Sequence, residues 1–390
     1  MTEYSLKDKV AIVGIGETRY YKRGAAPVSE FQLALEAIRK AVADAGLRME
    51  DVDGFASYSN DRNEPSRLAA ALGIPQLQFS NMQWGGGGGG MAAAVGNAAA
   101  AIVAGFATHV VAFRALAQGQ FGRFGQSPTK TARVSGPLAY MAPYGLMSPA
   151  QRFAMRTQRF MYEHHITQET LANIALASYK HAQYNPRAVM YGRPLTREAY
   201  HNSRWIVEPF HLFDCCLEND GAAAVLLTTA ERARDLPHKP VYLMAAAQGS
   251  SFRQGATAHN EPDYATSNFK SLVPRLFGMA GITPRDIDVA QVYENFTGGV
   301  LMSLVEHGFC QGDEAEEFCA AGNLEWPHGK LPLNTSGGNL AEAYMHGLEL
   351  VLEGTRQLRD ASTCQVKDAQ FCLVAAGPMV TPVSNLILRN

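Results

Sequence analysis

The stretch ALEAIRKAVADAGLRMEDVDGFASYSN (residues 34–60) resembles a later stretch, SLVPRLFGMAGITPRDIDVAQVYEN (residues 271–295). Six identical pairs share one offset of 235 residues: Ala45/Ala280, Gly46/Gly281, Asp51/Asp286, Asp53/Asp288, Tyr58/Tyr293 and Asn60/Asn295. A second similarity relates GGGMAAAVGNAAAAIVAG (88–105) to GGNLAEAYMHGLELVLEG (337–354). In both stretches a helix is predicted that begins at a glycine pair and ends at a glycine. An Ala-Gly turn before an acidic residue and a strand recurs by chance in α/β proteins, but two similarities in the same order favour a duplication.

Each half is predicted to run strand, helix, strand, glycine-rich turn, helix, strand. Strands are expected at 10–16, 55–59, 108–115 and 221–229 in the first half, and at 241–249, 289–296, 371–377 and 385–390 in the second, with an amphipathic helix at 29–45. This alternation predicts an α/β fold with mostly parallel sheets and helices on both faces. The expected units are a first half (1–115 plus 206–235), an aromatic and Met-rich insert (116–205) that covers a site, and a second half (236–390).

Composition narrows the class of protein. The 390 residues are 47% apolar and 18% charged with a net charge of -2, which excludes global disorder and argues against a nucleic-acid binder. Residues 68–113 carry no Asp, Glu, Lys or Arg, but their glycines, Asn97 and His109 favour a buried helix and strand over a membrane span. The N-terminus shows no secretory signal, and six cysteines without CxxC spacing predict reduced, packed thiols of a cytoplasmic protein. The low charge also suits an oligomer.

Five segments in one order resemble the thiolase superfamily, closest to its sterol-carrier-protein-x branch of thiolase-like lipid-transfer proteins. They are VAIVGIGETRYYKR (10–23), HAQYNPRAVMYGRPLT (181–196), DCCLENDGAAAVLLTTAERA (214–233), VYENFTGG (292–299) and LNTSGGNLAEAYMHG (333–347). The resemblance covers essentially the whole chain. It implies a duplicated thiolase fold with two βαβαβαββ-type halves in five αβαβα layers, and an inserted loop subdomain.

The positions that are catalytic in thiolases depart from the thiolase pattern. The resemblance places the nucleophilic cysteine at Gly88 or Gly89, the histidine of the GHP motif at Tyr344, and the first residue of the NEAF or HDCF motif at Tyr293. Cys372 lies near the second cysteine position but not clearly in register. Glycine offers no nucleophile for an acyl-enzyme, so thiolase or acyltransferase activity is not expected.

Carbon–carbon cleavage without an acyl-enzyme is possible when the β-carbon of an acyl-CoA bears a hydroxyl. A base removes that proton, a ketone or aldehyde leaves, and the thioester enolate is reprotonated, which is a retro-aldol reaction. Glycine for cysteine with tyrosines in YENF and AYMHG resembles the thiolase-like aldolases of steroid side-chain degradation. That resemblance implies Tyr293 and Tyr344 as the acid–base residues. It implies 17-hydroxy steroid side-chain acyl-CoA substrates, cleaved to a 17-ketosteroid and propionyl-CoA, or to acetyl-CoA from shorter side chains.

The same resemblance implies a homodimer and a small partner built from an OB-fold and a zinc ribbon, together a heterotetramer. Any zinc would then belong to the partner, because this chain shows no metal-ligand cluster and is expected to hold no cofactor of its own; coenzyme A enters with the substrate. The alternative from another class is a degenerate, non-catalytic thiolase that binds acyl-CoA or lipid or acts as a scaffold. In that alternative, Tyr293 is an ordinary core aromatic, as Tyr58 is expected to be.

The remaining candidates have weaker patterns. Gly88-Gly89 and Gly337-Gly338 precede helices whose free N–H groups favour an oxyanion, although glycine pairs also serve simple turns. The glycine run is also expected to make room for a bulky substrate unless Trp84 or Met91 fills it.

Three polar residues complete the list of candidates. His346 is predicted on another face of the helix that carries Tyr344, where it packs or tunes. His259 follows a strand in a polar stretch and could reach the site. Asn295 could orient Tyr293, although strand alternation turns neighbouring side chains apart.

Overall fold

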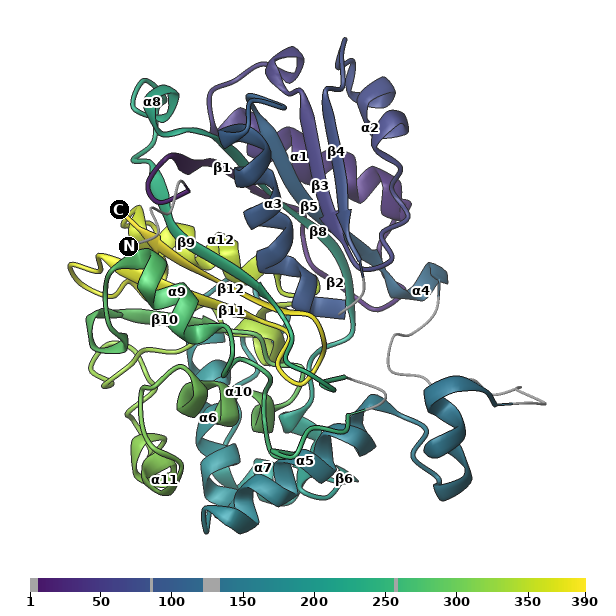
Figure 1. Ribbon diagram of the computed structural model, residues 1–390, viewed down its shortest axis with the longest axis vertical. Coiled ribbons are helices and arrows are strands. Elements are labelled where there is room, and N and C mark those ends of the chain that lie inside the picture. Colours follow the sequence, from purple (N-terminus) through teal and green to yellow (C-terminus); the bar gives the residue numbers. More distant parts are fainter. Residues whose placement is uncertain (1–5, 85–86, 122–133, 256–258) are drawn as a thin grey trace.

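The structure is a computed structural model that describes residues 6–84, 87–121, 134–255 and 259–390 (Figure 1). Its strands are β1 (Val10–Glu17), β2 (Tyr21–Lys22), β3 (Gly54–Tyr58), β4 (Phe79–Gln83), β5 (Val110–Ala117), β6 (Trp205–Val207), β7 (Phe210–His211), β8 (Asn219–Thr229), β9 (Val241–Gly249), β10 (Val289–Val292), β11 (Phe371–Ala376) and β12 (Val383–Arg389). Its α-helices are α1 (Glu30–Asp44), α2 (Pro65–Leu72), α3 (Met91–Val103), α4 (Gln118–Phe121), α5 (Pro149–Glu163), α6 (Gln168–Ala182), α7 (Arg197–His201), α8 (Ala230–Ala233), α9 (Val273–Ala280), α10 (Thr297–Glu306), α11 (Ala315–Phe318) and α12 (Leu348–Leu358).

The predicted duplication is visible in the strand order, which runs β10-β11-β12-β9-β1-β8-β5-β3-β4. Read outward from the β1–β9 contact, the first half gives β1, β8, β5, β3 and β4, and the second gives β9, β12, β11 and β10. In the second half, a parallel bridge between Ala290 and Leu333 takes the position that β4 has in the first half. The two halves therefore repeat one topology, and the predicted strands lie at the expected places.

The expectation of mostly parallel sheets is wrong. Among the strands that the structure describes, the parallel pairs are β3 with β4, β3 with β5, and β10 with β11, whereas β8 and β12 run antiparallel to both of their long neighbours. The last strand of each half returns without a crossover helix on its sheet: β11 reaches β12 through a short turn, and β5 reaches β8 through the insert. An alternation of strands and helices could not reveal these two reversals.

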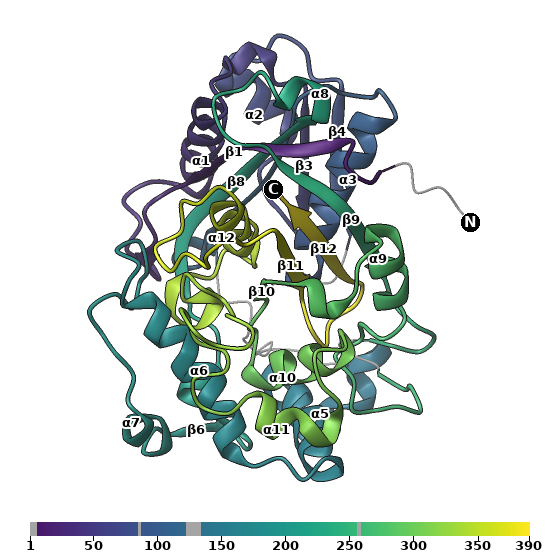
Figure 2. The same cartoon turned by 90° about the vertical axis from the view of Figure 1, so that its left-hand side faces the viewer.

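Helices α3 and α12 form the middle layer of the fold, between the strands of the two halves. Helix α3 contacts β3 and β5 of its own half but also β9, β11 and β12, while α12 contacts β10 and β11 of its own half and also β1 and β8. Helix α1 covers the outer face of the first sheet, and α9 packs on β9 and β12. Figure 2 shows α12 and α9 on opposite sides of β11 and β12. This arrangement is the five-layer αβαβα fold that was predicted.

Small residues let α1 approach β1 closely. A Cβ on Gly14 would lie 2.0 Å from the carbonyl oxygen of Ala41, and one on Gly16 would lie 2.2 Å from that of Ala37. A capping box at Ser29 begins the helix, where the serine side chain accepts a hydrogen bond from the Gln32 N–H. The glycines of VGIG therefore serve helix–strand contact.

The segment between β5 and β8 packs mainly on the second half, although it interrupts the first half in sequence. Helices α5 and α6 contact α10, and α6 also contacts the short π-helix at Gly338–Glu342 (Figure 1). Gly298 of α10 meets α5 so closely that a Cβ there would lie 2.2 Å from the Thr157 Oγ1. Within the described residues, no helix is long and apolar enough to cross a membrane.

Candidate active site

Two buried tyrosines meet between the sheets. Tyr293 directly follows β10, and its N–H donates to the Ala375 carbonyl of β11. Its hydroxyl donates a 2.7 Å hydrogen bond to the hydroxyl of Tyr344, and only 2% and 8% of the two residues are exposed. The two residues lie 51 positions apart in the chain, yet the fold brings their phenol groups into direct contact.

Tyr344 reaches this place because the predicted helix over 337–354 is interrupted, so that prediction is wrong. The π-helix ends at Glu342, Ala343 is extended, and α12 begins only at Leu348. The prediction that His346 shares a helix with Tyr344 is wrong for the same reason, because His346 (φ 52°) and Gly347 (φ 91°) are left-handed.

Buried polar groups compensate for the hydrogen bonds that this interruption removes. The Tyr344 N–H donates to Asn219 Oδ1 at 2.6 Å, and the Met345 N–H donates to Glu349 Oε2 at 3.2 Å. The Tyr58 hydroxyl donates to the carbonyls of Met345 and His346. The segment carrying Tyr344 is thus fixed from three sides, because buried backbone groups need partners.

Glycines surround the ring of Tyr293. A Cβ on Gly88 would lie 2.2 Å from ring atoms of Tyr293, and one on Gly347 would lie 2.5 Å from its Cδ2. The space that a cysteine side chain would need at position 88 is therefore occupied by this ring. It is not filled by Trp84, which is 83% exposed. The space freed at Gly88 accommodates the phenol instead of a bulky substrate.

The other predicted glycines serve close packing. A Cβ on Gly89 would lie 2.3 Å from the Pro382 carbonyl oxygen, and the Gly89 carbonyl accepts from Ser384. The Gly337 N–H donates to the Asn334 carbonyl, so this group is already paired. A Cβ on Gly338 would lie 2.0 Å from Glu294 Oε2. An oxyanion role for these N–H groups remains a prediction.

Asn295 and His346 both lie near the pair. Asn295 follows the end of β10, donates to the Pro378 carbonyl at 2.8 Å and accepts from the Phe296 N–H. It therefore ties the Tyr293 segment to the turn after β11. The ring of His346 lies 5.3 Å from that of Tyr344, edge to face, and burial lowers its pKa well below the usual value.

Burial dominates the electrostatics of the two phenols and raises the pKa of both well above 10. The contact between them acts in opposite directions, raising the pKa of Tyr293 and lowering that of Tyr344. Arg114 on β5 also lowers the pKa of Tyr344. Its side chain is buried in an ion pair with Asp61 at 3.0 Å, and it donates to the Tyr58 carbonyl. Burial, Cys216 and Glu349 raise the pKa of Tyr344, so both phenols are neutral, and Tyr344 is the one of the pair that accepts a hydrogen bond from the other.

The thiols of the region are protonated. Burial raises the pKa of Cys216, which neighbours both tyrosines, to about 12, and raises that of Cys372 further. Cys372 sits in the interior of the fold, at the start of β11 and opposite Leu388 of β12, three residues before the carbonyl that holds Tyr293. Protonated thiols are poor nucleophiles, so the chemistry of an acyl-enzyme has no support here. All six cysteines are unpaired, and four of them are buried.

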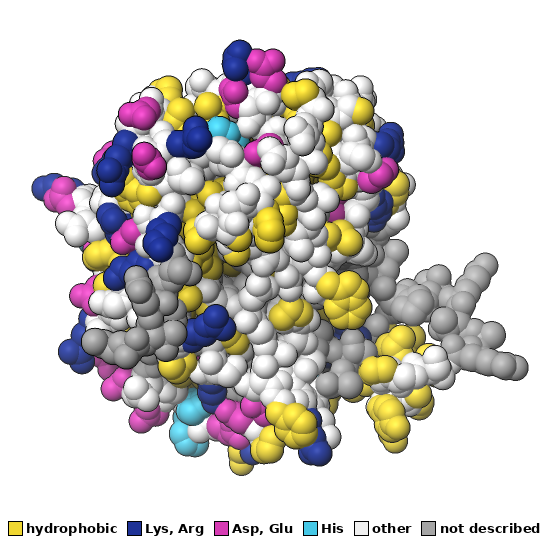
Figure 3. Space-filling view, turned by 45° about the horizontal axis from the view of Figure 1, so that its top comes forward, with side chains coloured by type: hydrophobic (Ala, Val, Ile, Leu, Met, Phe, Trp, Pro, Cys, Tyr) yellow, Lys and Arg dark blue, Asp and Glu magenta, His cyan; other side chains and the backbone are white. Residues whose placement is uncertain are grey.

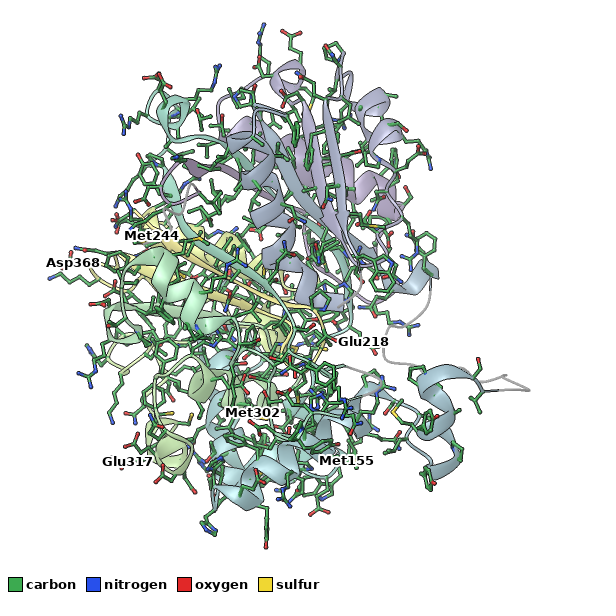
Figure 4. All side chains as sticks on the ribbon, viewed as in Figure 1. Met155, Glu218, Met244, Met302, Glu317 and Asp368 are labelled. Carbon is green, nitrogen blue, oxygen red and sulfur yellow. The ribbon has the colours of Figure 1, made fainter. Side chains whose placement is uncertain are left out.

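A pocket of about 460 Å³ opens beside the insert, lined by Pro137, Tyr140, Met141, Leu146, Arg152, Met155, Arg156, His259, Asn260 and Tyr264. Figure 4 shows Met155 on α5 at this side of the molecule. Arg156 is buried at its base, where it donates to the Met379 carbonyl at 3.1 Å. Burial lowers the pKa of His259 to about 4. The structure therefore places His259 in this pocket, not in contact with the two phenols.

Met379 and Pro378 link the pocket to the tyrosines. Arg156 holds one side of this turn, Asn295 donates to the other, and a Cβ on Gly377 would lie 2.2 Å from the Gly89 nitrogen. Among the described residues, no three His, Cys, Asp or Glu side chains gather in a group that could hold a metal ion.

Sequence reasoning missed three side chains that build the site: Arg114, Asn219 and Glu349. Arg114 is a charged residue within an otherwise apolar strand, which is a usable signal. Asn219 and Glu349 carried none, because a partner for a backbone N–H depends on the interruption before α12.

Known proteins share this fold. A family model described as "Thiolase C-terminal domain-like" matches residues 250–390. The chain is 41% identical to a steroid side-chain-cleaving aldolase of Thermomonospora curvata, over 98% of both sequences. It is 42% identical to the 17-hydroxy-3-oxo-4-pregnene-20-carboxyl-CoA lyase of Mycobacterium tuberculosis, over 98% of this chain and 100% of that protein. The solved structure of an "Ltp2-ChsH2(DUF35) aldolase" superposes with a TM-score of 0.91 at 40% identity, covering 99% of both chains. The predicted resemblance is confirmed, and the chain belongs to the thiolase superfamily, in the family of the steroid side-chain-cleaving aldolases.

Proposed function

We propose that this chain catalyses retro-aldol cleavage of a 17-hydroxy steroid side-chain acyl-CoA, giving a 17-ketosteroid and propionyl-CoA, or acetyl-CoA from a shorter side chain. Two relatives that match nearly the full length are named as such an aldolase and such a CoA lyase. The observation that carries the proposal is the 2.7 Å contact between Tyr293 and Tyr344 beside a glycine without a side chain.

The reaction requires one base and one acid. The base removes the proton of the 17-hydroxyl, the bond from C17 to the side chain breaks, and its electron pair passes into the thioester enolate. A proton returned to the α-carbon of that enolate completes the short acyl-CoA, so no free coenzyme A is consumed. A nucleophile is not needed, and the buried thiols of the region do not supply one.

The surroundings support Tyr344 as the base and Tyr293 as its hydrogen-bond donor. Tyr344 accepts the hydroxyl of Tyr293 and lies in the field of Arg114, and both effects favour its phenolate. Because both phenols are neutral in the free protein, we place the proton transfer within the bound complex, as a relay through the pair.

The pocket beside the insert is our candidate entrance for the acyl-CoA. It is lined by apolar and aromatic side chains with two arginines, and the Pro378-Met379 turn separates it from the pair. Arg152, whose buried Nε has no hydrogen-bond partner among the described residues, suits a phosphate of coenzyme A. The domain division of the sequence analysis, with residues 116–205 as a cover over this entrance, is part of the proposal.

We also propose a homodimer and, with it, a small partner of OB-fold and zinc-ribbon type in a heterotetramer, with any zinc in the partner. The name of the superposed aldolase, Ltp2-ChsH2(DUF35), joins two components. We place the contact with a second subunit at a hollow along α3 and β9, because Arg275 is the one charged residue among its 13 described lining residues. Figure 3 shows mostly uncharged surface in the middle of this face. Six unpaired thiols suit the cytoplasm.

The test incubates the chain, co-expressed with such a partner, with a 17-hydroxy steroid side-chain acyl-CoA. Mass spectrometry follows the ketosteroid and the short acyl-CoA. Cleavage at the same rate with and without free coenzyme A is expected. Turnover that depends on added coenzyme A would mean thiolysis, and binding without cleavage would favour the non-catalytic alternative.

A further inference from the structure

A second cavity, of about 1020 Å³, lies where the first loop of the chain meets the insert. Its walls come from the end of β1, the loop and strand β2 that follow, helix α1, residues 186–189 and α12. Two of the segments that carried the family resemblance, ETRYYK (17–22) and PRAV (186–189), therefore meet at one cleft. The proposed reaction uses neither of them.

Positive charge is in excess in this cleft. The lining residues include five cations and two anions: Arg19, Lys22, Lys40, Arg187 and Arg356 against Glu17 and Asp44. This balance contrasts with a net charge of -2 for the whole chain.

Internal ion pairs neutralise part of that charge. Lys40 pairs with Glu36 at 2.7 Å, and Asp44 pairs with Arg359 at 2.9 Å. These pairs leave four cations and the carboxylate of Glu17 among the lining residues. Behind the wall, the buried carboxylates of Glu342 and Glu353 also interact with Arg356.

Glu17 does not saturate its two arginine neighbours. Its Oε1 lies 2.5 Å from Arg356 Nη2 and 3.1 Å from Arg187 Nε, and its Oε2 accepts the Tyr20 hydroxyl. Within the described residues, the buried Nη2 of Arg187 and Nη1 of Arg356 have no hydrogen-bond partner, and Glu353 lies 3.9 Å from the latter. The Arg356 side chain is 10% exposed. Buried guanidinium nitrogens without partners are costly, and a ligand oxygen would satisfy them.

The rim supplies two further cations. Arg19 and Lys22 are exposed, and the Arg19 guanidinium lies 5.6 Å from the ring of Tyr21. A ligand that enters between rim and base would thus meet positive charge at both ends. Guanidinium groups recognise phosphate by paired hydrogen bonds, and lysine contributes a point charge.

We propose that this cleft is an anion site that binds a phosphate group of a small molecule, separate from the entrance beside the insert. The phosphate contacts the free nitrogens of Arg187 and Arg356 at the base, while Arg19 and Lys22 screen its charge at the rim. The cleft backs onto the proposed active site, because a Cβ on Gly221 would touch both Tyr20 of the cleft wall and Met345. Two sources share this chemistry, a free phosphorylated metabolite and the phosphates of coenzyme A itself.

The experiment titrates the full-length chain with inorganic pyrophosphate by calorimetry, at low and at raised salt. The test variant is Arg19→Gln/Lys22→Gln, which removes two exposed charges from the rim. The matched control is Arg232→Gln/Arg234→Gln, on α8 and directly after it, which removes the same charge from another exposed surface. Arg187→Gln probes the base of the cleft.

We expect saturable binding that weakens about tenfold in the rim variant and in Arg187→Gln, and that is unchanged in the control. Binding is expected to weaken with salt. Equal affinity in all four proteins, or no binding by the wild type, would overturn the proposal. A repeat with coenzyme A present identifies the source: competition assigns the site to the phosphates of coenzyme A, and independence assigns it to another metabolite.

Discussion

Gly88→Ala should disable the proposed catalytic pair without touching a polar atom. The new Cβ would lie 2.2 Å from Cε2 and Cζ of Tyr293 and 2.5 Å from its hydroxyl, where ordinary contact begins at 3.4 Å. The ring must therefore retreat by about 1.2 Å, the difference between 3.4 and 2.2 Å, or the glycine turn must move by as much. A displacement near 1 Å costs roughly 100-fold in rate when geometry controls catalysis, and overpacking a core costs about 1–3 kcal/mol of stability.

The assay measures kcat for side-chain cleavage together with the free energy of unfolding in urea. Gly88→Ala should lose about two orders of magnitude in kcat and a small part of its stability. Gly96→Ala on α3, whose Cβ would meet Ala246 at 3.1 Å, should keep its rate. In a Tyr293→Leu background the new Cβ meets no ring, so the additional loss of stability caused by Gly88→Ala should be smaller there than in wild type. A Gly88→Ala protein with wild-type rate and stability would refute the reasoning.

Two further predictions concern charge. In Arg114→Met/Asp61→Asn the positive charge that lowers the pKa of Tyr344 is lost, so the alkaline rise of kcat/KM should move to higher pH. An unchanged pH profile would show that Arg114 has no such effect. Burial raises the pKa of Glu294 from 4.5 to about 7, so this group's stabilisation is present below pH 4.5 and is lost as pH rises through 7, roughly 3 kcal/mol in all. Urea unfolding of Glu294→Gln should therefore show a smaller loss between these pH values than wild type, whereas exposed Glu317→Gln should match wild type.

The fold could be predicted because the two halves of the sequence are visibly similar. Strand alternation and the similar stretches at 34–60 and 271–295 placed the main strands and α1. The sheet directions could not be predicted, because a reversal at β8 or β12 depends on connection geometry and leaves the local apolar pattern unchanged.

The site could be predicted only in part, and for one physical reason. Motif register identified Tyr293 and Tyr344, but periodicity continued a helix through 337–354. The chain breaks there because the buried side chains of Asn219 and Glu349 replace helical partners of two N–H groups. Such long-range satisfaction of backbone groups has no local signature.

The most direct test of the central claim compares Tyr293→Phe, Tyr344→Phe and the double variant in the cleavage assay. If the two phenols act as one relay, each single variant should lose at least about 1000-fold in kcat. The double variant should then lose no more kcat than the less active of the two single variants. Acyl-CoA binding should survive in all three, since each change removes one hydroxyl from a pair that retains its ring packing. Cleavage within a few-fold of wild type in either single variant would contradict the account.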